Sequence, residues 1–152
     1  MEVQTISDLA KVYVASRASV PLRGQMWRKL RSMGVPITST WIDEDGEGQS
    51  ASLSELWDRI VKEIAAADYL ILYAEASDFP LEGALIEAGV ALGMGKPIFV
   101  CLPDVDLDPR SMRPIGSWIS HPLVTRVDTI EETLLPAWRL SEFRKGSNSN
   151  GD

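Results

Sequence analysis

Two apolar runs, Tyr69-Leu-Ile-Leu-Tyr-Ala74 and Pro97-Ile-Phe-Val-Cys-Leu102, decide the fold class. Neither run alternates apolar with polar residues, which is typical of strands buried on both faces of a parallel sheet. Between them, residues 82–92 combine small and apolar residues at helical spacing and precede the break at Gly93-Met-Gly95. A strand, a helix and a second strand in this order predict a right-handed crossover within an α/β sheet.

The same alternation continues on both sides of this unit. We expect, in chain order, a strand over residues 11–16, a helix over 19–33, a strand over 35–42, a helix over 52–67, a strand over 124–127 and a helix from residue 129. Ser19 and Ser52 are the expected N-caps, and Pro21 suits a first helical turn. The pattern predicts a single flavodoxin-like, Rossmann-like α/β domain with a five-stranded parallel sheet of order 2-1-3-4-5 and helices on both faces.

The chain has 152 residues, the size of one domain. We expect that domain over residues 1–143 and a disordered tail over 144–152, whose polar residues have nothing to bury. The net charge of −7 argues against a nucleic-acid polymer or a membrane as partner, because both select basic surfaces. No apolar run approaches the roughly 20 residues of a membrane span. With one Cys and one His, we expect a cytoplasmic protein without a metal site.

Parallel sheets of this kind bind ligands beyond the carboxyl ends of the strands, where the strand order reverses. Here that rule selects Ala15-Ser16-Arg17 and the segment from Glu75 to Glu87. Glu87 lies among small and apolar residues near a helix start and is expected to face the crevice. The alternative is a partly exposed acid that the helix-terminus amides stabilise. Glu82 lies about 140° away around the helix and is expected to be an ordinary first-turn acid.

Other features favour no chemistry. Gly-rich phosphate loops and the nucleophile elbow are absent from the sequence. Cys101 falls in a predicted buried strand, where a thiol is usually inert, and His121 precedes a proline in an expected turn. The acidic loop that starts at Asp43 has Ser54 at the twelfth position, where a calcium loop needs Glu, so we expect a solvated loop.

Four motifs resemble those of the nucleoside 2-deoxyribosyltransferase family, whose relatives include the 2′-deoxynucleoside 5′-phosphate N-hydrolases. They are Tyr13-Val-Ala-Ser-Arg17, Ala67-Asp68, Gly83-x-x-x-Glu87-x-Gly89 and Leu92-Gly-x-Gly-Lys-Pro97. The segments 38–43 and 121–132 are similar to a phage and bacterial branch of the family. The resemblance covers about residues 11–135, and its motifs coincide with the segments that the sheet rule selects.

This resemblance implies the chemistry of a retaining glycosidase without a cofactor. Glu87 matches the nucleophile that attacks C1′ of the sugar, and an ionised carboxylate near a helix N-terminus suits that role. Tyr13 matches the tyrosine that orients this carboxylate; from the residues alone, a core aromatic is equally expected. The substrate implied is a small nucleoside or nucleotide, and the family implies a homodimer or higher homo-oligomer.

Further residues are candidates for substrate binding. Ser16 and Arg17 follow the first strand, where relatives that bind a phosphate place donors, and Arg17 could supply local positive charge. Trp41 could stack on a nucleobase, with a core position as the alternative. Gly83 belongs to the nucleophile motif, and Arg113 lies in a long loop that could reach the site.

One departure from the family concerns an acid that binds the sugar. The family usually has an Asp eight residues before the position of Asp68, where this chain has Ile60. Asp58 is the candidate replacement and is included among the catalytic candidates; Glu63 fits only a secondary acidic position. If Asp58 does not reach the site, the sugar contact is lost.

Three functions follow from these observations. The first is an N-glycosidase or deoxyribosyltransferase, and the second is a nucleotide-binding module of the same fold that has lost catalysis. The third is a subunit that acts through protein contacts alone. Acidic loops at residues 43–47 and 104–108 are expected near the mouth of the site, where they would repel a phosphate unless Arg17 or Arg113 offsets them.

Overall fold

The computed structural model describes residues 10–44 and 52–134 of the chain. Its elements are, in chain order, β1 (Val12–Ala15), α1 (Pro21–Ser32), η2 (Thr40–Asp43), α2 (Leu53–Ala66), β2 (Tyr69–Tyr73), η3 (Ala76–Asp78), α3 (Gly83–Gly93), β3 (Ile98–Cys101), η4 (Ser117–Ser120) and β4 (Val124–Val127). The η elements are short 3₁₀ turns, and residues 130–134 begin a further helix. Apart from the strand expected over residues 35–42, the α/β alternation is confirmed, with strand and helix bounds within about two residues of those predicted.

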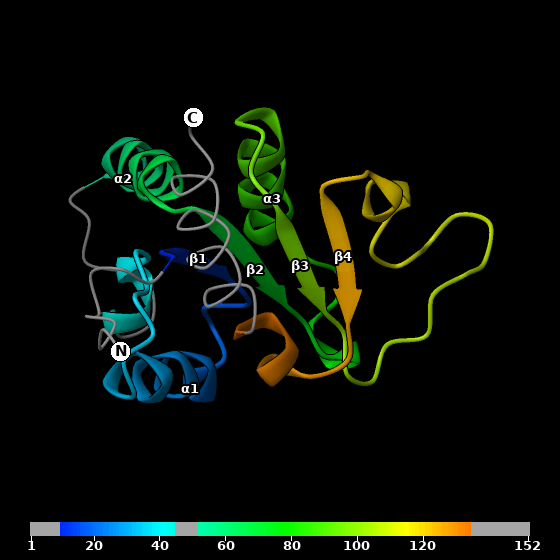
Figure 1. The fold of residues 1–152 in the computed structure, drawn as a ribbon, viewed down its shortest axis with the longest axis horizontal. Coiled ribbons are helices and arrows are strands. Elements are labelled where there is room, and N and C mark those ends of the chain that lie inside the picture. The colour runs from blue at the N-terminus through cyan, green and yellow to red at the C-terminus, as the bar shows by residue number, and fades with distance from the viewer. Residues whose placement is uncertain (1–9, 45–51, 135–152) are drawn as a thin grey trace, which may run out of the picture.

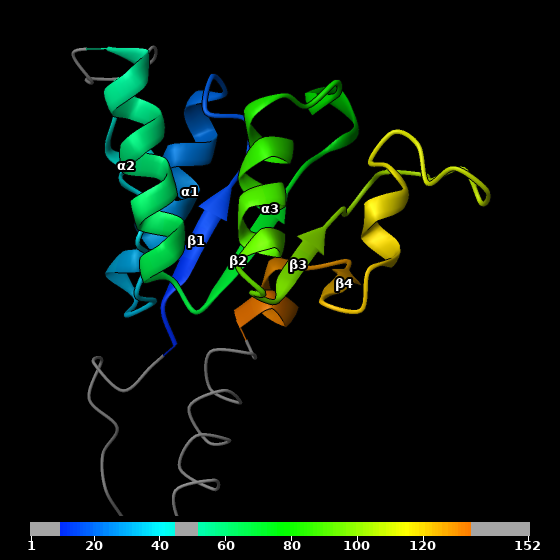
Figure 2. The same ribbon diagram turned by 90° about the horizontal axis from the view of Figure 1, so that it is seen from above.

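A parallel sheet of order β1-β2-β3-β4 forms the centre of the molecule (Figure 1). The register pairs Tyr13 with Leu70 between the first two strands and Leu72 with Val100 between the next two. Helices α2 and α3 cover one face of the sheet, whereas α1 and residues 130–134 cover the other (Figures 1 and 2). This is the layered arrangement that buried, non-alternating strands require.

Each strand sends successive side chains to opposite faces, so the core consists of two layers. In β1, Tyr13 and Ala15 contribute to the layer under α2 and α3, whereas Val12 and Val14 contribute to the layer over α1. In β2, Leu70 and Leu72 share the first layer. Tyr13 is therefore on the face that carries Glu87, and this placement follows directly from the period of the strand.

The expected strand over residues 35–42 is wrong. Among the described residues the sheet has four strands, and Ile37 pairs with Val12 only as an isolated parallel bridge beside β1. The backbone N–H of Val12 donates to the carbonyl of Pro36 at 2.9 Å, and that of Thr38 donates to the carbonyl of Val12 at 2.8 Å. The five-strand order is therefore not confirmed, although this segment does run along β1.

Side chains replace the missing backbone ladder at Val14. Its N–H donates to Oγ of Ser39 at 3.1 Å, and its carbonyl accepts from Nε1 of Trp41 at 2.7 Å. These two bonds satisfy the open edge of β1, where an unpaired buried backbone group would be costly. The chain can then enter η2 instead of continuing as a strand.

Local sequence signals mark most helix ends. Ser52 caps α2, since its Oγ accepts from the N–H of Glu55 at 3.1 Å, and Pro21 is the first residue of α1. Ser19 is not the N-cap of α1: that position is Val20, which has no side-chain cap bond. Gly34, with φ of +103°, follows α1 as expected of a residue that ends a helix.

Two predictions lie outside the described residues, namely the tail over 144–152 and most of the acidic loop that starts at Asp43. Within the part of the chain that the structure describes, no helix has the length and apolar character needed to span a membrane.

Candidate functional site

A cavity of about 370 Å³ lies where the sheet rule places a ligand, beyond the carboxyl ends of β1 and β2. Its walls are residues 16–19 after β1, the segment from Asp78 to Ala84 that leads into α3, and Glu87 of α3. The segments that follow β1 and β2 emerge at the same end of the sheet (Figure 2). The volume falls in the range of small-molecule sites.

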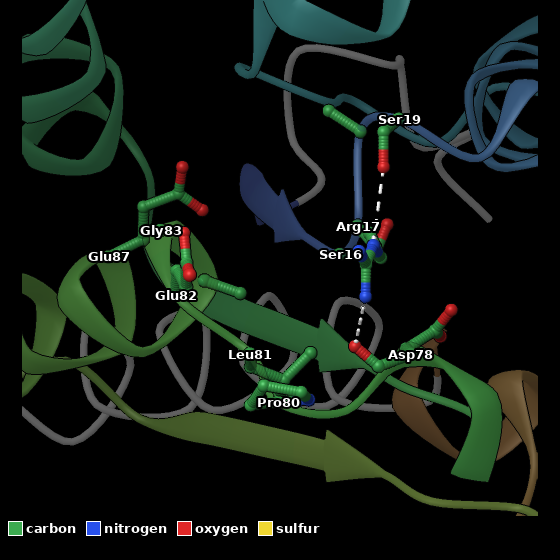
Figure 3. Close-up of a pocket in the computed structure, with 11 residues that line it drawn as sticks. Ser16, Arg17, Ser19, Asp78, Pro80, Leu81, Glu82, Gly83 and Glu87 are labelled. Carbon is green, nitrogen blue, oxygen red and sulfur yellow. Dashed lines mark hydrogen bonds between the residues drawn. The ribbon is translucent and has the colours of Figure 1, made fainter.

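Glu87 is 9% exposed and lines this cavity from the second turn of α3 (Figure 3). Burial raises the pKa of its carboxyl, the Tyr13 hydroxyl lowers it and the Glu63 carboxylate raises it, to a result of about 8. The raised pKa favours a neutral carboxyl in the free protein, whereas the sequence leads one to expect an ionised acid there. The neutral form is favoured because burial disfavours the charged carboxylate.

Tyr13 lies beneath Glu87 in β1 and is completely buried. Its hydroxyl has no partner of full hydrogen-bond geometry among the described residues, yet it is close enough to Glu87 for the two groups to alter each other's pKa. Both observations fit a close contact that is imperfectly aligned. Burial and then the Glu87 carboxylate raise the pKa of Tyr13 well above its ordinary value, so the phenol stays protonated and can donate.

Glu63 of α2 influences both groups from the side of η2. Its carboxylate accepts from the N–H of Thr40 at 2.9 Å and from the Thr40 hydroxyl at 2.8 Å. These bonds hold a carboxylate near Glu87 and Tyr13, and it raises the pKa of both. Glu63 thus acts on Glu87 through space and is not a residue of the cavity wall.

The opposite wall carries hydrogen-bond donors (Figure 3). The guanidinium of Arg17 donates through Nε to Oγ of Ser19 at 3.2 Å and through Nη1 to the carbonyl of Asp78 at 2.8 Å. Ser16 is 8% exposed and also lines the cavity. The structure therefore brings Ser16, Arg17 and Gly83 together with Glu87 in one cavity, as the sequence predicts.

A buried ion-pair network holds the segment after β2. Arg23 of α1 pairs with Glu75 and with the fully buried Asp78, each at 2.6 Å. Its guanidinium also lies over the ring of Tyr73, 4.7 Å from the centroid, and the Tyr73 hydroxyl donates to Glu75 at 3.1 Å. This network neutralises Asp78 at the floor of the cavity and fixes the carbonyl that Arg17 contacts. Sequence patterns gave no signal for it, because its members come from α1, β2 and η3.

A second cavity of about 240 Å³ adjoins the first and shares Ala18 and Ser19 with it. Trp41, Gln25 and Arg28 contribute to its walls, together with Pro21, Gly24 and Glu44. Trp41 is half-buried against the core and also lines this cavity, and its stacking on a base stays a prediction.

Glu82 lines the cavity, although the sequence predicts an ordinary first-turn acid away from the face of Glu87. It lies at the N-cap of α3, with φ of −126° and ψ of −85°, and its side chain makes no cap bond. The rotation of 3.6 residues per turn does not apply to a residue outside the helix. Glu82 therefore lines the same cavity as Glu87, and Figure 3 shows both carboxylates on the same side of it.

Solved structures of other proteins resemble this chain in fold. A 2-desoxiribosyltransferase from Leishmania mexicana matches with a TM-score of 0.57 and 18% identity, over 86% of this chain and 95% of that one. The CMP N-glycosidase of Clostridium botulinum matches with a TM-score of 0.51 and 18% identity, over 83% and 96%. The chain has the fold of these two proteins. The resemblance expected from the sequence motifs is thus confirmed at the level of the fold.

A 2-deoxyribosyltransferase from the psychrotolerant bacterium Bacillus psychrosaccharolyticus has a TM-score of 0.49 and 20% identity, over 65% of this chain and 77% of that one. No family model matches the sequence, and no curated protein matches it.

The acid that the family resemblance leads one to expect is not present in this fold. Ile60 is 5% exposed and packs in the apolar layer that contains Tyr13. Asp58 does not replace it: its side chain is 65% exposed on α2 and pairs with Lys62 at 2.7 Å, one turn further along. Asp58 points away from the cavity because positions 58 and 60 lie about 200° apart on a helix.

Three more candidates do not reach the cavity. Arg113 is exposed in the long loop before η4. His121 accepts from the N–H of Leu123 through Nδ1 at 3.0 Å, which is the turn role expected for it. Cys101 is buried in β3, and burial raises the pKa of its thiol to about 12, so the expected inert thiol is confirmed.

The Gly-Lys-Pro motif before β3 is structural. Gly95 has φ of +73°, a conformation that favours glycine, just after α3. The Lys96 ammonium donates to the carbonyls of Ala65 and Ala67 and so satisfies the C-terminal end of α2. Residues 10–44 and 52–134 include no cluster of three His, Cys, Asp or Glu residues that could hold a metal ion.

Proposed function

We propose that this protein cleaves or transfers at the N-glycosidic bond of a nucleoside or nucleoside 5′-monophosphate, with Glu87 as nucleophile. The observation that carries the proposal is the buried carboxyl of Glu87, which lines the cavity next to the fully buried hydroxyl of Tyr13. The likeness of fold to a 2-desoxiribosyltransferase and a CMP N-glycosidase supports the same class of reaction.

In the proposed reaction an oxygen of ionised Glu87 attacks C1′ as the bond from C1′ to the base nitrogen breaks. The electron pair of that bond leaves with the base, and a glycosyl ester forms on Glu87. A water molecule or a second base then attacks C1′ and frees the carboxylate. Tyr13 donates toward the Glu87 carboxylate and orients it, which is a positioning role.

Glu82 is the residue that we assign to proton transfer. It lines the cavity, makes no cap bond to α3 and belongs to no ion pair among the described residues, so its carboxyl can face a ligand. Its proton goes to the departing base, and its carboxylate then accepts a proton from the attacking water. We expect Glu82→Gln to slow base release, with a smaller loss for bases that depart readily without protonation.

The donor-rich wall of residues 16–19 supports a 5′-monophosphate over a nucleoside. Arg17 supplies local positive charge at this wall, and Arg23 neutralises Asp78. The adjoining cavity beside Trp41 is a suitable place for the base, since it opens next to Ala18 and Ser19. An aromatic ring at its wall can stack on any base.

The test is base release from the common 2′-deoxynucleosides, ribonucleosides and their 5′-monophosphates, followed by chromatography. We expect the wild type to release base from at least one monophosphate and Glu87→Gln to release none while still binding it. Glu87→Gln retains the shape of the side chain and removes the nucleophilic charge. Ser111→Ala, in an exposed loop away from the cavity, is the matched control and should retain full activity. If the wild type releases base from none of these compounds, the proposed enzymatic activity is refuted.

The second candidate function is a nucleotide-binding module without turnover. The observation in its favour is Ile60, an apolar residue at the position where the family usually has a sugar-binding acid. Nucleotide-induced rises in the melting temperature without any product would favour this module. No rise with any nucleotide would exclude it.

We also propose a homo-oligomer. The apolar side chains of Leu53 in α2 and Ile86 in α3 are 77% and 57% exposed, which supports a partner on the outer face of these helices. Light scattering at micromolar concentration tests this, and a monomeric mass would contradict it.

A further inference from the structure

The hydroxyl of Ser16 is held by a partner that can only donate. Nε1 of Trp27 lies 3.0 Å from Oγ of Ser16, and both residues are buried. An indole N–H is a donor without acceptor capacity, so Oγ of Ser16 must accept in this bond. The hydroxyl proton of Ser16 is consequently available to another acceptor.

The cavity is the place where that acceptor can be supplied. Ser16 lines the cavity, whereas Trp27 does not and is completely buried behind it in α1. Among residues 10–44 and 52–134, the Ser16 hydroxyl donates to no side chain or carbonyl. The ring of Trp27 is itself fixed, since it packs edge-on against Tyr73 with the ring centroids 6.2 Å apart.

Ser19 is held in the same way on the same wall. Its Oγ accepts from Nε of Arg17 at 3.2 Å, and a guanidinium also has no acceptor capacity. Two serine hydroxyls of residues 16–19 therefore each keep a proton for a ligand, while one of the two oxygen lone pairs is already used. Such a wall suits a ligand oxygen that only accepts, as in a phosphate, better than a sugar hydroxyl, which also needs an acceptor for its own proton.

We infer that Trp27 is a positioning residue that determines selectivity for an anionic substrate by turning the Ser16 hydroxyl into a hydrogen-bond donor to it. Trp27 acts through Ser16 and does not touch the ligand. The inference rests on the proposed function, because it concerns the group that the proposed substrate carries on its sugar.

Binding measurements on five forms of the protein, a parent and four variants of it, test this assignment. Trp27→Phe removes the N–H and keeps an aromatic ring, Ser16→Ala removes the hydroxyl, and the double variant removes both. Trp118→Phe is the matched control, since Nε1 of Trp118 donates to the carbonyl of Ile115 at 2.8 Å, away from the cavity. All forms carry Glu87→Gln to prevent turnover, and calorimetry measures dissociation constants for 2′-deoxynucleosides and their 5′-monophosphates.

We expect Trp27→Phe and Ser16→Ala each to weaken binding of the monophosphate by about 3- to 10-fold. Binding of the nucleoside should change less than about 2-fold. The double variant should resemble either single variant, because the two residues act as one unit. Additive losses, or equal losses for nucleoside and monophosphate, would overturn the assignment and indicate a packing role.

The indole proton resonance of Trp27 gives a readout that is independent of affinity. The chain has five Trp residues, and the resonance that is absent from the spectrum of Trp27→Phe identifies this one. We expect Ser16→Ala, and separately the addition of monophosphate, to shift it although Trp27 is fully buried. A resonance that neither change moves would refute the role of Trp27.

The outcomes separate this inference from the proposed function. Base release with unchanged selectivity in Trp27→Phe would leave the proposed function intact and remove the inference. If the variants selectively lose monophosphate binding but the wild type releases no base, the proposed enzymatic function is refuted and the role of Trp27 stands. No binding of any monophosphate or nucleoside to any form would overturn both.

Discussion

Glu87 in α3 and Tyr13 in β1 meet across the interface between helix and sheet, and each alters the protonation of the other. Burial raises the pKa of Glu87 to about 8, and the Tyr13 hydroxyl partly opposes this effect. At neutral pH the free protein therefore holds Glu87 mainly in its neutral form. The proposed nucleophile is the charged form of Glu87, so we expect the activity to depend on pH through this pair.

The rate of base release should rise with pH in Glu82→Gln, where Glu87 is the catalytic carboxyl that still titrates. For free Glu82→Gln enzyme and free substrate, kcat/KM is expected to increase about tenfold per pH unit below pH 8 and to level off above it. Adding Tyr13→Phe removes the hydroxyl that lowers the pKa of Glu87, so this rising limb of the profile should move to higher pH. A pH profile of kcat/KM for Glu82→Gln with and without Tyr13→Phe checks this; an unmoved limb would show that the hydroxyl does not act on Glu87.

Glu63→Gln should move the same limb in the opposite direction. The Glu63 carboxylate raises the pKa of Glu87, so its neutral amide should allow Glu87 to ionise at lower pH. The amide oxygen can still accept from Thr40, which preserves the contact between α2 and η2. Activity near pH 7 should therefore increase modestly. Lys62→Gln, which removes an exposed charge one residue away, is the control and should leave the profile unchanged.

Glu87 should also make stability depend on pH. Its pKa is about 8 in the folded protein against an ordinary value of 4.5, so the unfolded chain loses this proton first as pH rises. The neutral carboxyl makes its full contribution to the free energy of unfolding below about pH 4.5. This contribution is lost as pH rises to about 8, at up to about 1.4 kcal/mol per pH unit. In urea unfolding between pH 5 and pH 8, the free energy of unfolding of Glu87→Gln should increase relative to that of the wild type as pH rises. Parallel curves would contradict the raised pKa.

Arg23→Met should destabilise the fold strongly. It leaves the buried carboxylate of Asp78 without its ion-pair partner, and a broken buried pair typically costs about 3–5 kcal/mol in the free energy of unfolding. Arg31→Met, which breaks the exposed pair with Asp43, should cost less than about 1 kcal/mol. Equal losses for the two variants in urea unfolding would show that the Arg23 network does not stabilise the segment after β2.

The sequence predicted the α/β class, because each element carries its own local signal. The unbroken apolar run over residues 69–74 marks a buried strand, and Ser52 and Gly34 mark helix ends. The strand over residues 35–42 was a plausible prediction from composition. It fails because Ser39 and Trp41 satisfy the edge of β1 with side chains, and no rule of composition anticipates such a contact.

In the candidate site too, some features can be predicted from the sequence and others cannot. The location of the cavity and the presence of Ser16, Arg17 and Glu87 in it follow from the order of strands and from the short segments after them. The contribution of Glu82 does not, since it depends on the backbone angles of one residue that precedes α3. Asp58 fails for a geometric reason, the two-residue offset that turns it to the outer face of α2.

The sequence by itself determined the class of fold, the end of the sheet where the cavity lies and the acid that lines it. These depend on periodicity and chain order, which are local properties. Only the tertiary structure decided the neutral state of Glu87, the buried network around Arg23 and the donor-only partner behind Ser16. Each of these arises where residues distant in the chain share a volume without water, because charge and hydrogen bonding there depend on neighbours that only folding supplies.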